Sequence, residues 1–382
     1  MPNLIVSTVG TSLLTNYANR QKDQFLSALL RDTANAGEKG LSIDQKKAID
    51  RAAEEVKSAL ARAKTSELPG LSAELNSLYS YYGRRFWEKD TALDHHVLIA
   101  TDTYQGQKTA EILQEHLKFA GIKSVEVYVP PGLCTKNRAS FTAGVNEVVK
   151  WCEDTLPGYR QSRYHIVFNL VGGFKSLQGY MNTLGMFYAD EIIYIFEAPT
   201  ADLIRIPRLP VVMDEIPVLK EKAALFALLE HGYLAGREEV AGIPEIYLEF
   251  DDTGEHALLS TWGLLIWRRN KQKILGEELR QFPALFYERS FEKDFDSITD
   301  RSRRARVQSE LAKASLLYRE QGLEGLRRDG GYLYSNLEGK KSASGQTIGH
   351  FRLSDGWRIT CVPDGSILRL RRVGPHAINE NP

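Results

Sequence analysis

The first apolar run of the chain is Leu4-Ile5-Val6-Ser7-Thr8-Val9, and it leads directly into Gly10-Thr11-Ser12. A strand followed by glycine and small hydroxyl residues is typical of the first unit of a parallel α/β sheet. There, backbone N–H groups of the turn and the start of the next helix bind an anion. Gly10, Thr11 and Ser12 are therefore candidate phosphate-binding residues. The turn lacks the full G-x-G-x-x-G pattern, so by itself it is a weak signal.

Four more apolar segments alternate with helix-patterned segments over the first 210 residues. The predicted strands are 97–101, 125–129, 165–171 and 192–196, and the predicted helices include 43–63, 109–120 and 143–152. This order favours a Rossmann-like parallel sheet with helices on both faces. Residues 17–87 are too many for a simple crossover, so we expect an extra helical excursion there.

A second glycine turn follows the fourth predicted strand. It reads Asn169-Leu170-Val171-Gly172-Gly173-Phe174-Lys175. The second strand leads into a further polar turn with Asp102, Thr103 and Gln105. Ligands of open parallel sheets bind at the carboxyl ends of strands near the switch point, so the three turns are predicted to line one cavity. The alternative is that the glycines only relieve crowding and that Lys175 is only solvated.

The remaining chain is predicted to hold two more domains. A proline-marked stretch, 206–217, indicates a connector, so the predicted domains are 1–212, 213–292 and 293–382. The middle one has the pattern of a winged helix-turn-helix, and the last is predicted to be α+β with an antiparallel sheet. Residues 301–382 carry fifteen Lys and Arg against eight Asp and Glu, while the rest carries 34 against 41. This distribution indicates a basic domain on an acidic carrier and a nucleic-acid partner.

Composition also narrows the class of protein. Three cysteines without C-x-x-C spacing predict packed thiols and neither a disulfide framework nor a zinc site. No stretch has the roughly 20 apolar residues of a membrane span or the pattern of a signal peptide. We therefore expect a cytoplasmic protein without a metal site or a membrane partner.

Cleavage of RNA without a metal needs a base for the 2′-hydroxyl proton, cations for the phosphorane and an acid for the leaving 5′-oxygen. The last domain supplies these chemical types in Lys340, Lys341, Arg352, Arg369, Arg371 and His376. Arg369 and Arg371 are two residues apart in a predicted strand and are expected to share a face, which Arg352 joins from a neighbouring strand. A passive RNA-binding surface is the alternative, because arginine-rich strands also bind nucleic-acid backbone without cutting it.

On its Gly-Thr-Ser and Gly-Gly-x-Lys turns, the segment 1–210 resembles the CARF family of CRISPR-associated Rossmann-fold sensors. The resemblance implies a homodimer that binds a cyclic oligoadenylate second messenger across its two-fold axis. Cyclic tetra-adenylate is the expected ring, because a ring of four suits a two-fold dimer, and a ring of six, which is also symmetric, is the alternative. It also implies that Ser12 and Lys175 contact the ligand backbone and, in some members, promote slow cleavage of the ring.

From Arg301 onward the chain resembles RelE-type mRNA interferases. The resemblance rests on His350-Phe351-Arg352-Leu353, Trp357-Arg358-Ile359 and Val373-Gly374-Pro375-His376. It implies cleavage of mRNA in the ribosomal A site, by 2′-hydroxyl attack that leaves a 2′,3′-cyclic phosphate. The implied roles are charge stabilisation by Arg352 and by Arg369 or Arg371, a base or electrostatic aid at Lys340 or Lys341, and an acid at His376.

Sensor, winged helix and interferase in this order resemble the CARF–RelE fusions found with type III CRISPR systems. The resemblance implies an endoribonuclease that cyclic oligoadenylate activates, that associates with ribosomes when active and that needs no cofactor. Two alternatives stay open. One is a ring nuclease that removes the second messenger, and the other is a ligand-responsive transcription regulator that places its winged helix on DNA.

Overall fold

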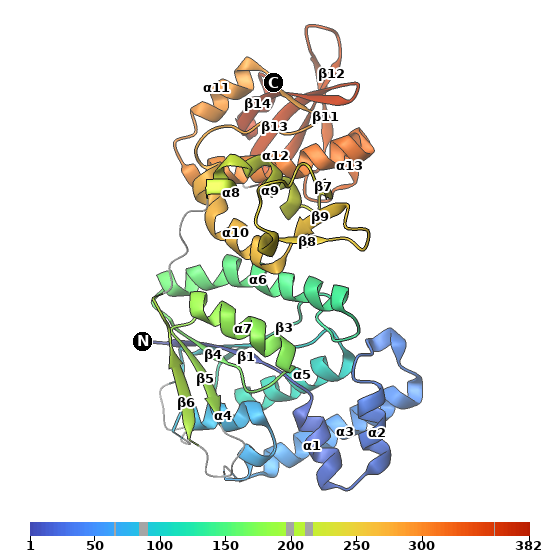
Figure 1. The fold of residues 1–382 in the computed structure, drawn as a ribbon, viewed down its shortest axis with the longest axis vertical. Helices are drawn as coiled ribbons and strands as arrows, with labels where there is room; N and C mark the ends of the chain where they lie inside the picture. Colours follow the sequence, from blue (N-terminus) through green and yellow to red (C-terminus); the bar gives the residue numbers. More distant parts are fainter. Residues whose placement is uncertain (65, 84–90, 196–201, 211–216, 355) are drawn as a thin grey trace. The chain divides into compact units, whose positions relative to one another are not determined.

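The computed structural model describes residues 1–64, 66–83, 91–195, 202–210, 217–354 and 356–382. It divides into two compact units, Met1–Met213 and Asp214–Pro382, which are described separately (Figure 1). The first unit is α/β with a mixed, mostly parallel sheet, and the second adds two further sheets with antiparallel strands. The end of the predicted fifth strand, residue 196, and part of the predicted connector, 211–216, lie outside the described residues.

The described part of unit 1 is built on a six-stranded sheet in the order β3-β2-β1-β4-β5-β6. Its strands are β1 (Asn3–Thr8), β2 (His95–Ile99), β3 (Ser124–Tyr128), β4 (His165–Asn169), β5 (Glu191–Ile195) and β6 (Leu203–Pro207). Strands β1 to β5 pair in parallel, and β6 pairs antiparallel to β5. The five predicted strands are therefore confirmed. No strand is predicted at β6, whose last two residues fall in the predicted connector 206–217.

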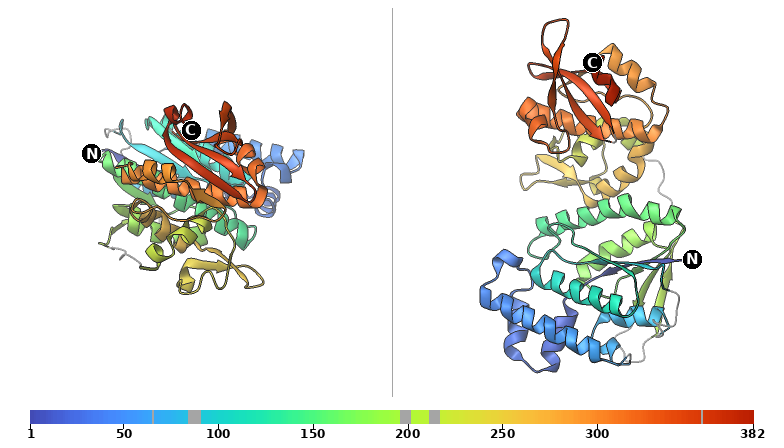
Figure 2. Two further views of the ribbon diagram at one scale, coloured as in Figure 1. Left: turned by 90° about the horizontal axis from the view of Figure 1, so that it is seen from above. Right: turned by 180° about the vertical axis from the view of Figure 1, so that it is seen from behind.

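Helices cover both faces of this sheet (Figures 1 and 2). The long excursion between β1 and β2 contains α1 (Ser12–Arg20), α2 (Gln24–Asp32), the 3-10 turn η1 (Glu38–Gly40), α3 (Ile43–Arg62), η2 (Leu68–Gly70) and α4 (Ala73–Tyr81). These helices and α5 (Tyr104–Phe119) lie on one face, and α6 (Arg138–Gln161) and α7 (Lys175–Tyr188) lie on the other. The chain changes face between β1 and β4, so the topological switch point lies between these two strands.

The helix α3 shows why the excursion folds. Ser42 and Gln45 form a capping box at its start, which satisfies N–H groups that have no partner within the helix. Its buried residues Ile49, Ala52, Val56 and Leu60 recur at helical spacing, so one stripe packs into the core while the opposite face stays polar.

Unit 2 contains a five-stranded sheet in the order β10-β14-β13-β12-β11. The strands are β10 (Leu285–Tyr287), β11 (Ser335–Lys341), β12 (Thr347–Ser354), β13 (Trp357–Asp364) and β14 (Ile367–Pro375). Strands β11 to β14 are antiparallel, as predicted, and β10 is parallel to β14. Helix α12 (Arg301–Gln321) packs beside the sheet with α13 (Leu323–Arg328), and α11 (Arg289–Asp296) and the turn η5 (His376–Asn379) contact β14 (Figure 2).

The middle segment of the chain carries α8 (Pro217–Glu221), α9 (Ala223–Glu230), η4 (Glu245–Tyr247) and α10 (Thr261–Leu275). A small antiparallel sheet joins β7 (Ala235–Gly236), β9 (His256–Leu259) and β8 (Leu248–Phe250). Ala257 to Leu259 belong to β9 and Ser260 caps α10, so the helix of this segment begins only at Thr261. The predicted boundary at 292/293 falls inside unit 2, where β10 pairs with β14.

No described helix is long and apolar enough to cross a membrane. The three cysteines are free and buried, which confirms the prediction of packed thiols. Burial raises the pKa of the Cys152 and Cys361 thiols well above the usual value, so neither thiol is a ready nucleophile.

Candidate functional site

The two glycine turns of unit 1 meet at the switch point. The turn after β1 lies so close to the turn after β4 that a Cβ atom at Gly10 would be 2.8 Å from the Gly173 nitrogen. The Thr8 hydroxyl donates a hydrogen bond to the Gly172 carbonyl at 2.6 Å. Gly173 has a φ of +90°, which disfavours any residue with a Cβ. The structure thus brings the first two predicted turns together, and their glycines are required by this close approach.

A buried glutamate, Glu74 at the start of α4, links the two turns. Its carboxylate accepts hydrogen bonds from the Gly10 N–H at 2.9 Å, the Ser12 hydroxyl at 3.1 Å and the Ser72 hydroxyl at 2.6 Å. A Cβ atom at Gly172 would collide with the same carboxylate, and Glu74 is 0 % exposed. Two of the donors predicted to hold a phosphate therefore already bind an anion that belongs to the protein.

The exposed part of the junction consists of two helix N-termini. Helix α1 begins at Ser12 and α7 begins at Lys175, and neither helix has a side-chain N-cap bond or an acidic residue in its first turn. Lys175 is exposed. A lysine at a helix N-terminus adds positive charge where the helix dipole is already positive. This end of α7 therefore favours an incoming anion.

Most of the other predicted ligand residues use their side chains for hydrogen bonds inside the protein. Asn169 is buried, accepts from the Ser77 hydroxyl at 2.6 Å and donates to the Ser7 hydroxyl at 3.2 Å. Thr103 caps α5, and Gln105 donates to the Leu30 carbonyl at 2.8 Å. These three side chains hold helices to the sheet and do not line an open cavity.

Asp102 is the exposed member of the third turn. Its carboxylate accepts from the Gly132 N–H at 2.9 Å and from the Gln107 side chain at 3.4 Å. These bonds tie the turn after β2 to the loop after β3. The third predicted turn thus contacts its neighbour on the side away from the paired glycine turns.

In unit 2, four basic side chains form a group that we name the cation cluster: His350, Arg352, Arg358 and His376. Arg352 on β12 lies directly opposite Arg358 on β13, and His350 is two residues away on the same strand face. Gly374 pairs with Arg358, and His376, two residues later, is close enough to His350 to affect its pKa. Like charges directly opposite each other are unfavourable, and no ion pair offsets the Arg352–Arg358 contact among the residues that the structure describes.

Burial and the neighbouring charges of the cluster lower the pKa of two of its members. Burial, together with Arg358 and His376, lowers the pKa of His350. Burial and the neighbouring Arg352 lower the pKa of Arg358. A histidine with a lowered pKa is neutral at pH 7 and is able to accept a proton.

Two buried polar atoms next to the cluster have no hydrogen-bond partner in the described part of the chain. They are His350 Nδ1 and the Thr360 hydroxyl, and the two residues face each other across β12 and β13. Such an atom costs about 1–3 kcal/mol relative to a satisfied one. A polar group that bound between them would recover this free energy.

The structure divides the six predicted catalytic residues among three places. Arg352 and His376 belong to the cation cluster. Arg369 and Arg371 share a face, as predicted, but both lie 3.4 Å from the Glu288 carboxylate and line a pocket of about 560 Å³ with it. The lysines lie on β11, where the Lys340 ammonium donates to the Glu380 carbonyl at 2.7 Å and Lys341 is exposed.

Sequence reasoning missed His350 and Arg358 as members of the site. The signal for His350 was available, because it stands two positions from Arg352 in a predicted strand and so shares its face. Arg358 required the register, which pairs it with Arg352. Glu74 had no comparable signal, because its helix lies in an excursion far from both turns in sequence.

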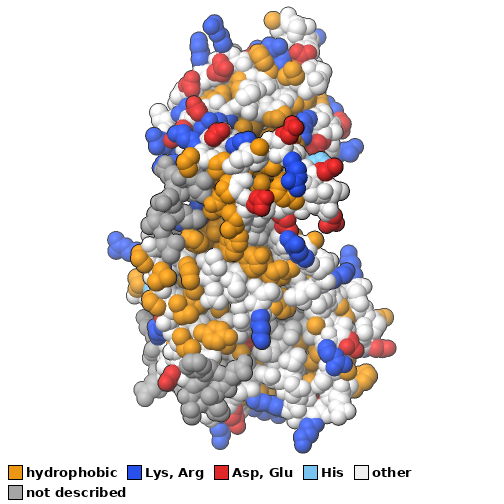
Figure 3. All heavy atoms as spheres, in the orientation of Figure 1, with side chains coloured by type: hydrophobic (Ala, Val, Ile, Leu, Met, Phe, Trp, Pro, Cys, Tyr) orange, Lys and Arg blue, Asp and Glu red, His pale blue; other side chains and the backbone are white. Residues whose placement is uncertain are grey.

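Charge in unit 2 is more mixed than its composition indicates. On the face that Figure 3 shows, Lys and Arg side chains of unit 2 stand among Asp and Glu side chains and form no continuous basic surface. The side chain of Arg372 makes a bidentate ion pair with Asp294, at 2.6 and 3.1 Å. Among the described residues, the cation cluster differs from Arg369, Arg371 and Arg372 in having no carboxylate partner, and not in the number of its charges.

The basic run 267–273 lies on α10, the helix that a DNA-binding winged helix would offer, and part of it serves the packing of unit 2. Buried Glu230 accepts from the Trp267 indole at 2.8 Å, from Arg268 at 3.0 Å and from Lys271 at 2.6 Å. Burial alone would raise the pKa of Glu230, but Lys271 and Arg268 hold it below the usual value. These two cations stabilise the packing of α9 on α10.

Comparison with known proteins bears on unit 1. No curated protein matches the chain. Residues 69–209 match a family described as "CRISPR-associated protein (Cas_APE2256)". The matched segment includes Glu74, β4 and the turn from Gly172 to Lys175, and excludes the turn at Gly10. The part of unit 1 that carries Glu74 and the second glycine turn is thus similar to a family of CRISPR-associated proteins.

Proposed function

We propose that the protein is an RNA-cleaving enzyme of CRISPR antiviral defence that a cyclic oligoadenylate, most readily cyclic tetra-adenylate, switches on. One observation carries the proposal. Two glycine turns meet at the switch point of a parallel sheet, next to a lysine at a helix N-terminus, and the second of these turns lies in a segment similar to a CRISPR-associated family. That position and that chemistry suit the phosphates of a nucleotide ligand.

In this proposal the ligand backbone binds at the start of α7. Lys175 supplies the charge, the free N–H groups of the first helical turn supply donors, and Ser12 lies across the junction, positioned by Glu74. Two copies of the chain related by a two-fold axis would present two such ends to one ring. The ring shifts the protein toward the active arrangement only as far as it binds that arrangement more tightly.

The cation cluster is the proposed site of cleavage. Neutral His350 takes the proton of the 2′-hydroxyl, whose oxygen attacks the adjacent phosphorus. Arg352 and Arg358 stabilise the charge that builds up on the phosphorane oxygens. Protonated His376 gives its proton to the 5′-oxygen as the bond from phosphorus to that oxygen breaks. The products are a 2′,3′-cyclic phosphate and a 5′-hydroxyl end, and no bound metal takes part.

The other predicted cations lie outside this centre. Lys341 pairs with Thr347 at the far end of β11, and Lys340 precedes it, while Arg369 and Arg371 are proposed to contact RNA backbone farther along the sheet. The proposed substrate is mRNA in the ribosomal A site, as the RelE resemblance implies, and cutting it arrests translation.

The test is to incubate the full-length protein with ribosomes stalled on a defined mRNA, with and without cyclic tetra-adenylate, and to map the cut sites. The expected result is a cut within the A-site codon that requires the ring. Arg352→Gln removes the cut, whereas Arg328→Gln, which removes an exposed arginine outside the cluster, does not. Lys175→Gln abolishes the response to the ring.

Other outcomes overturn the proposal in different ways. Degradation of the ring without any cut in RNA identifies a ring nuclease. Tight, salt-dependent binding of a specific DNA duplex, with no RNA cleavage, identifies a transcription regulator. Full cleavage by Arg352→Gln refutes the assignment of the site.

A further inference from the structure

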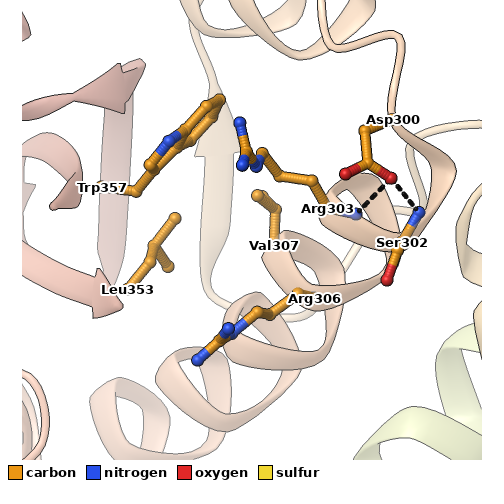
Figure 4. Close-up of a pocket in the computed structure, with 7 residues that line it drawn as sticks. All are labelled: Asp300, Ser302, Arg303, Arg306, Val307, Leu353 and Trp357. Carbon is orange, nitrogen blue, oxygen red and sulfur yellow. Dashed lines mark hydrogen bonds between the residues drawn. The ribbon is translucent and has the colours of Figure 1, made fainter. Parts of the chain in front are cut away.

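A small pocket opens in unit 2 between the first turns of α12 and the ends of β12 and β13 (Figure 4). Its volume is about 150 Å³. It is lined by Asp300, Ser302, Arg303, Arg306, Val307, Leu353 and Trp357. None of these residues belongs to the cation cluster, and the proposed cleavage chemistry does not use them.

The apolar wall of the pocket suits a flat ring. Val307 and Leu353 are buried and Trp357 is half-buried, so the indole presents part of its surface to the pocket. A cavity of roughly 150 Å³ with apolar walls accommodates a benzene-sized molecule. Bases stack on aromatic side chains in most complexes with single-stranded RNA.

The rim of the pocket is cationic. The Arg303 guanidinium lies 4.7 Å from the centre of the Trp357 ring, and Arg306 follows on the same face of α12, three residues later. Both arginines are exposed. Asp300 fixes this end of the helix, because its carboxylate accepts from the Ser302 N–H at 2.8 Å and from the Arg303 N–H at 3.4 Å (Figure 4).

The pocket is adjacent to the cation cluster along the chain. Trp357 and Arg358 are neighbours at the start of β13, so their side chains point to opposite faces of the sheet. An RNA strand that passes the tip of the β12–β13 hairpin would meet Arg358 on one face and Trp357 on the other.

We propose that this pocket binds one nucleotide of single-stranded RNA, with its base against Trp357 and its phosphate on Arg303 and Arg306. The inference rests on the proposed function, because it places this nucleotide beside the one that is cut. An apolar wall under a cationic rim fits a base joined to a phosphate better than it fits an acidic peptide, which has charge but no flat ring.

The test measures the binding of a fluorescein-labelled single-stranded octaribonucleotide to the full-length protein by fluorescence anisotropy at several salt concentrations. Arg303→Gln should weaken binding by about fivefold or more and should reduce the salt slope by about 0.7, the loss of one phosphate contact. Trp357→Leu keeps the wall apolar but removes the stacking surface, so it should weaken binding by a similar factor without changing the salt slope.

Arg319→Gln is the matched control. Arg319 stands on the same helix, and its guanidinium lies 4.6 Å from the centre of the Tyr233 ring, so the substitution removes the same charge and the same kind of ring contact outside the pocket. If Arg303→Gln and Arg319→Gln weaken binding equally, or if the wild-type protein binds no octaribonucleotide, the pocket proposal is wrong.

The two proposals fail separately. Ring-dependent cutting of mRNA by wild type, with unchanged octaribonucleotide binding in Arg303→Gln and Trp357→Leu, refutes the pocket and leaves the proposed function standing. Selective loss of binding in these two variants, with no ring-dependent cutting by wild type, supports the pocket and refutes the proposed function.

Discussion

The Glu74→Gln substitution tests whether one buried carboxylate holds the two glycine turns of unit 1 together. Glutamine has nearly the same shape, so the packing against Gly172 is kept. Its amide oxygen still accepts from the Gly10 N–H, which is a fixed donor. Its NH₂ group then faces the hydroxyls of Ser12 and Ser72, which must rotate to become acceptors. The substitution therefore changes the hydrogen bonds and little else.

The size of the effect follows from these three bonds. Hydrogen bonds to a charged group contribute about 1.5–3 kcal/mol and neutral ones about 0.5–1.5 kcal/mol. Replacing three charged bonds by neutral ones would cost several kcal/mol, but removing a buried charge recovers part of its desolvation. We expect the junction to lose about 1–2 kcal/mol, which corresponds to roughly 5- to 30-fold more frequent local opening.

Hydrogen exchange measured by mass spectrometry reports this opening directly. Peptides that contain Gly10 and Gly172 should exchange about 5 to 30 times faster in Glu74→Gln, while peptides from unit 2 should not change. Glu54→Gln is the control, because Glu54 lies on a helix of the same unit and its side chain is 72 % exposed. Unchanged exchange at both turns in Glu74→Gln would show that backbone packing, and not the carboxylate, joins them.

Three further predictions address pH and packing. Burial lowers the pKa of His96 to about 4, whereas its pKa in the unfolded chain is about 6.5. The unfolded chain therefore takes up the proton first as the pH falls, and the free energy of unfolding should decrease by about 2 kcal/mol between pH 7 and pH 5. Burial also lowers the pKa of His116 to about 4, so urea unfolding should show at least this loss, and His96→Gln should remove only the part that belongs to His96. Because the pKa of His350 is lowered, the acidic limb of the cleavage rate should have its midpoint below 6.5, and His350→Gln should lose that limb. Gly144→Ala should destabilise unit 1 by about 1–3 kcal/mol, because the new methyl group collides with the Leu133 backbone. Gly158→Ala in the same helix meets nothing within 4 Å and should stabilise it by about 0.5–1 kcal/mol in the same denaturation assay.

The sheet of unit 1 could be predicted where each strand is a separate apolar run in the sequence. Strands β1 to β5 are short apolar runs between helix-patterned segments, and each is found within a few residues of its predicted place. The strand β6 was missed because Pro207 and Pro210 read as breakers. It is the edge strand of the sheet and Pro207 is its last residue, a position where a missing N–H disrupts no interior pairing.

The middle of the chain shows the limit of pattern reading. Ala257-Leu258-Leu259 is an apolar run of three residues, which fits a strand and the start of a helix equally well. The cap at Ser260 decided the outcome, since its hydroxyl accepts from the Gly263 N–H at 3.1 Å. Helix α10 therefore begins after the run, and Ala257 pairs with Ala235 and Phe250 in the small sheet.

The chemical types of the residues indicated where the candidate sites lie, but not which of these residues are already bonded inside the protein. Glycine turns predicted the junction of β1 and β4, but Asn169 and Gln105, which were polar residues at the right strand ends, are buried and bonded inside the protein. Arginines predicted a basic face in the last domain, but Arg369 and Arg371 form ion pairs with Glu288 and do not belong to the cluster. A sequence records which side chains are able to bind a phosphate, and only the fold shows which of them are already bound.

That distinction is the reason why we propose the cation cluster, and not the Arg369–Arg371 pair, as the site of cleavage. An arginine held by a carboxylate must give up that partner before it binds a phosphate, so the gain in binding is offset by the loss of the ion pair. Arg352 and Arg358 instead face each other, and their repulsion destabilises the free protein. A phosphate that arrives between them removes this repulsion and adds two attractive contacts. The relief of this repulsion thus contributes to the free energy of phosphate binding. The phosphorane of the transition state carries more negative charge than the bound phosphate, so the same two contacts stabilise it more strongly.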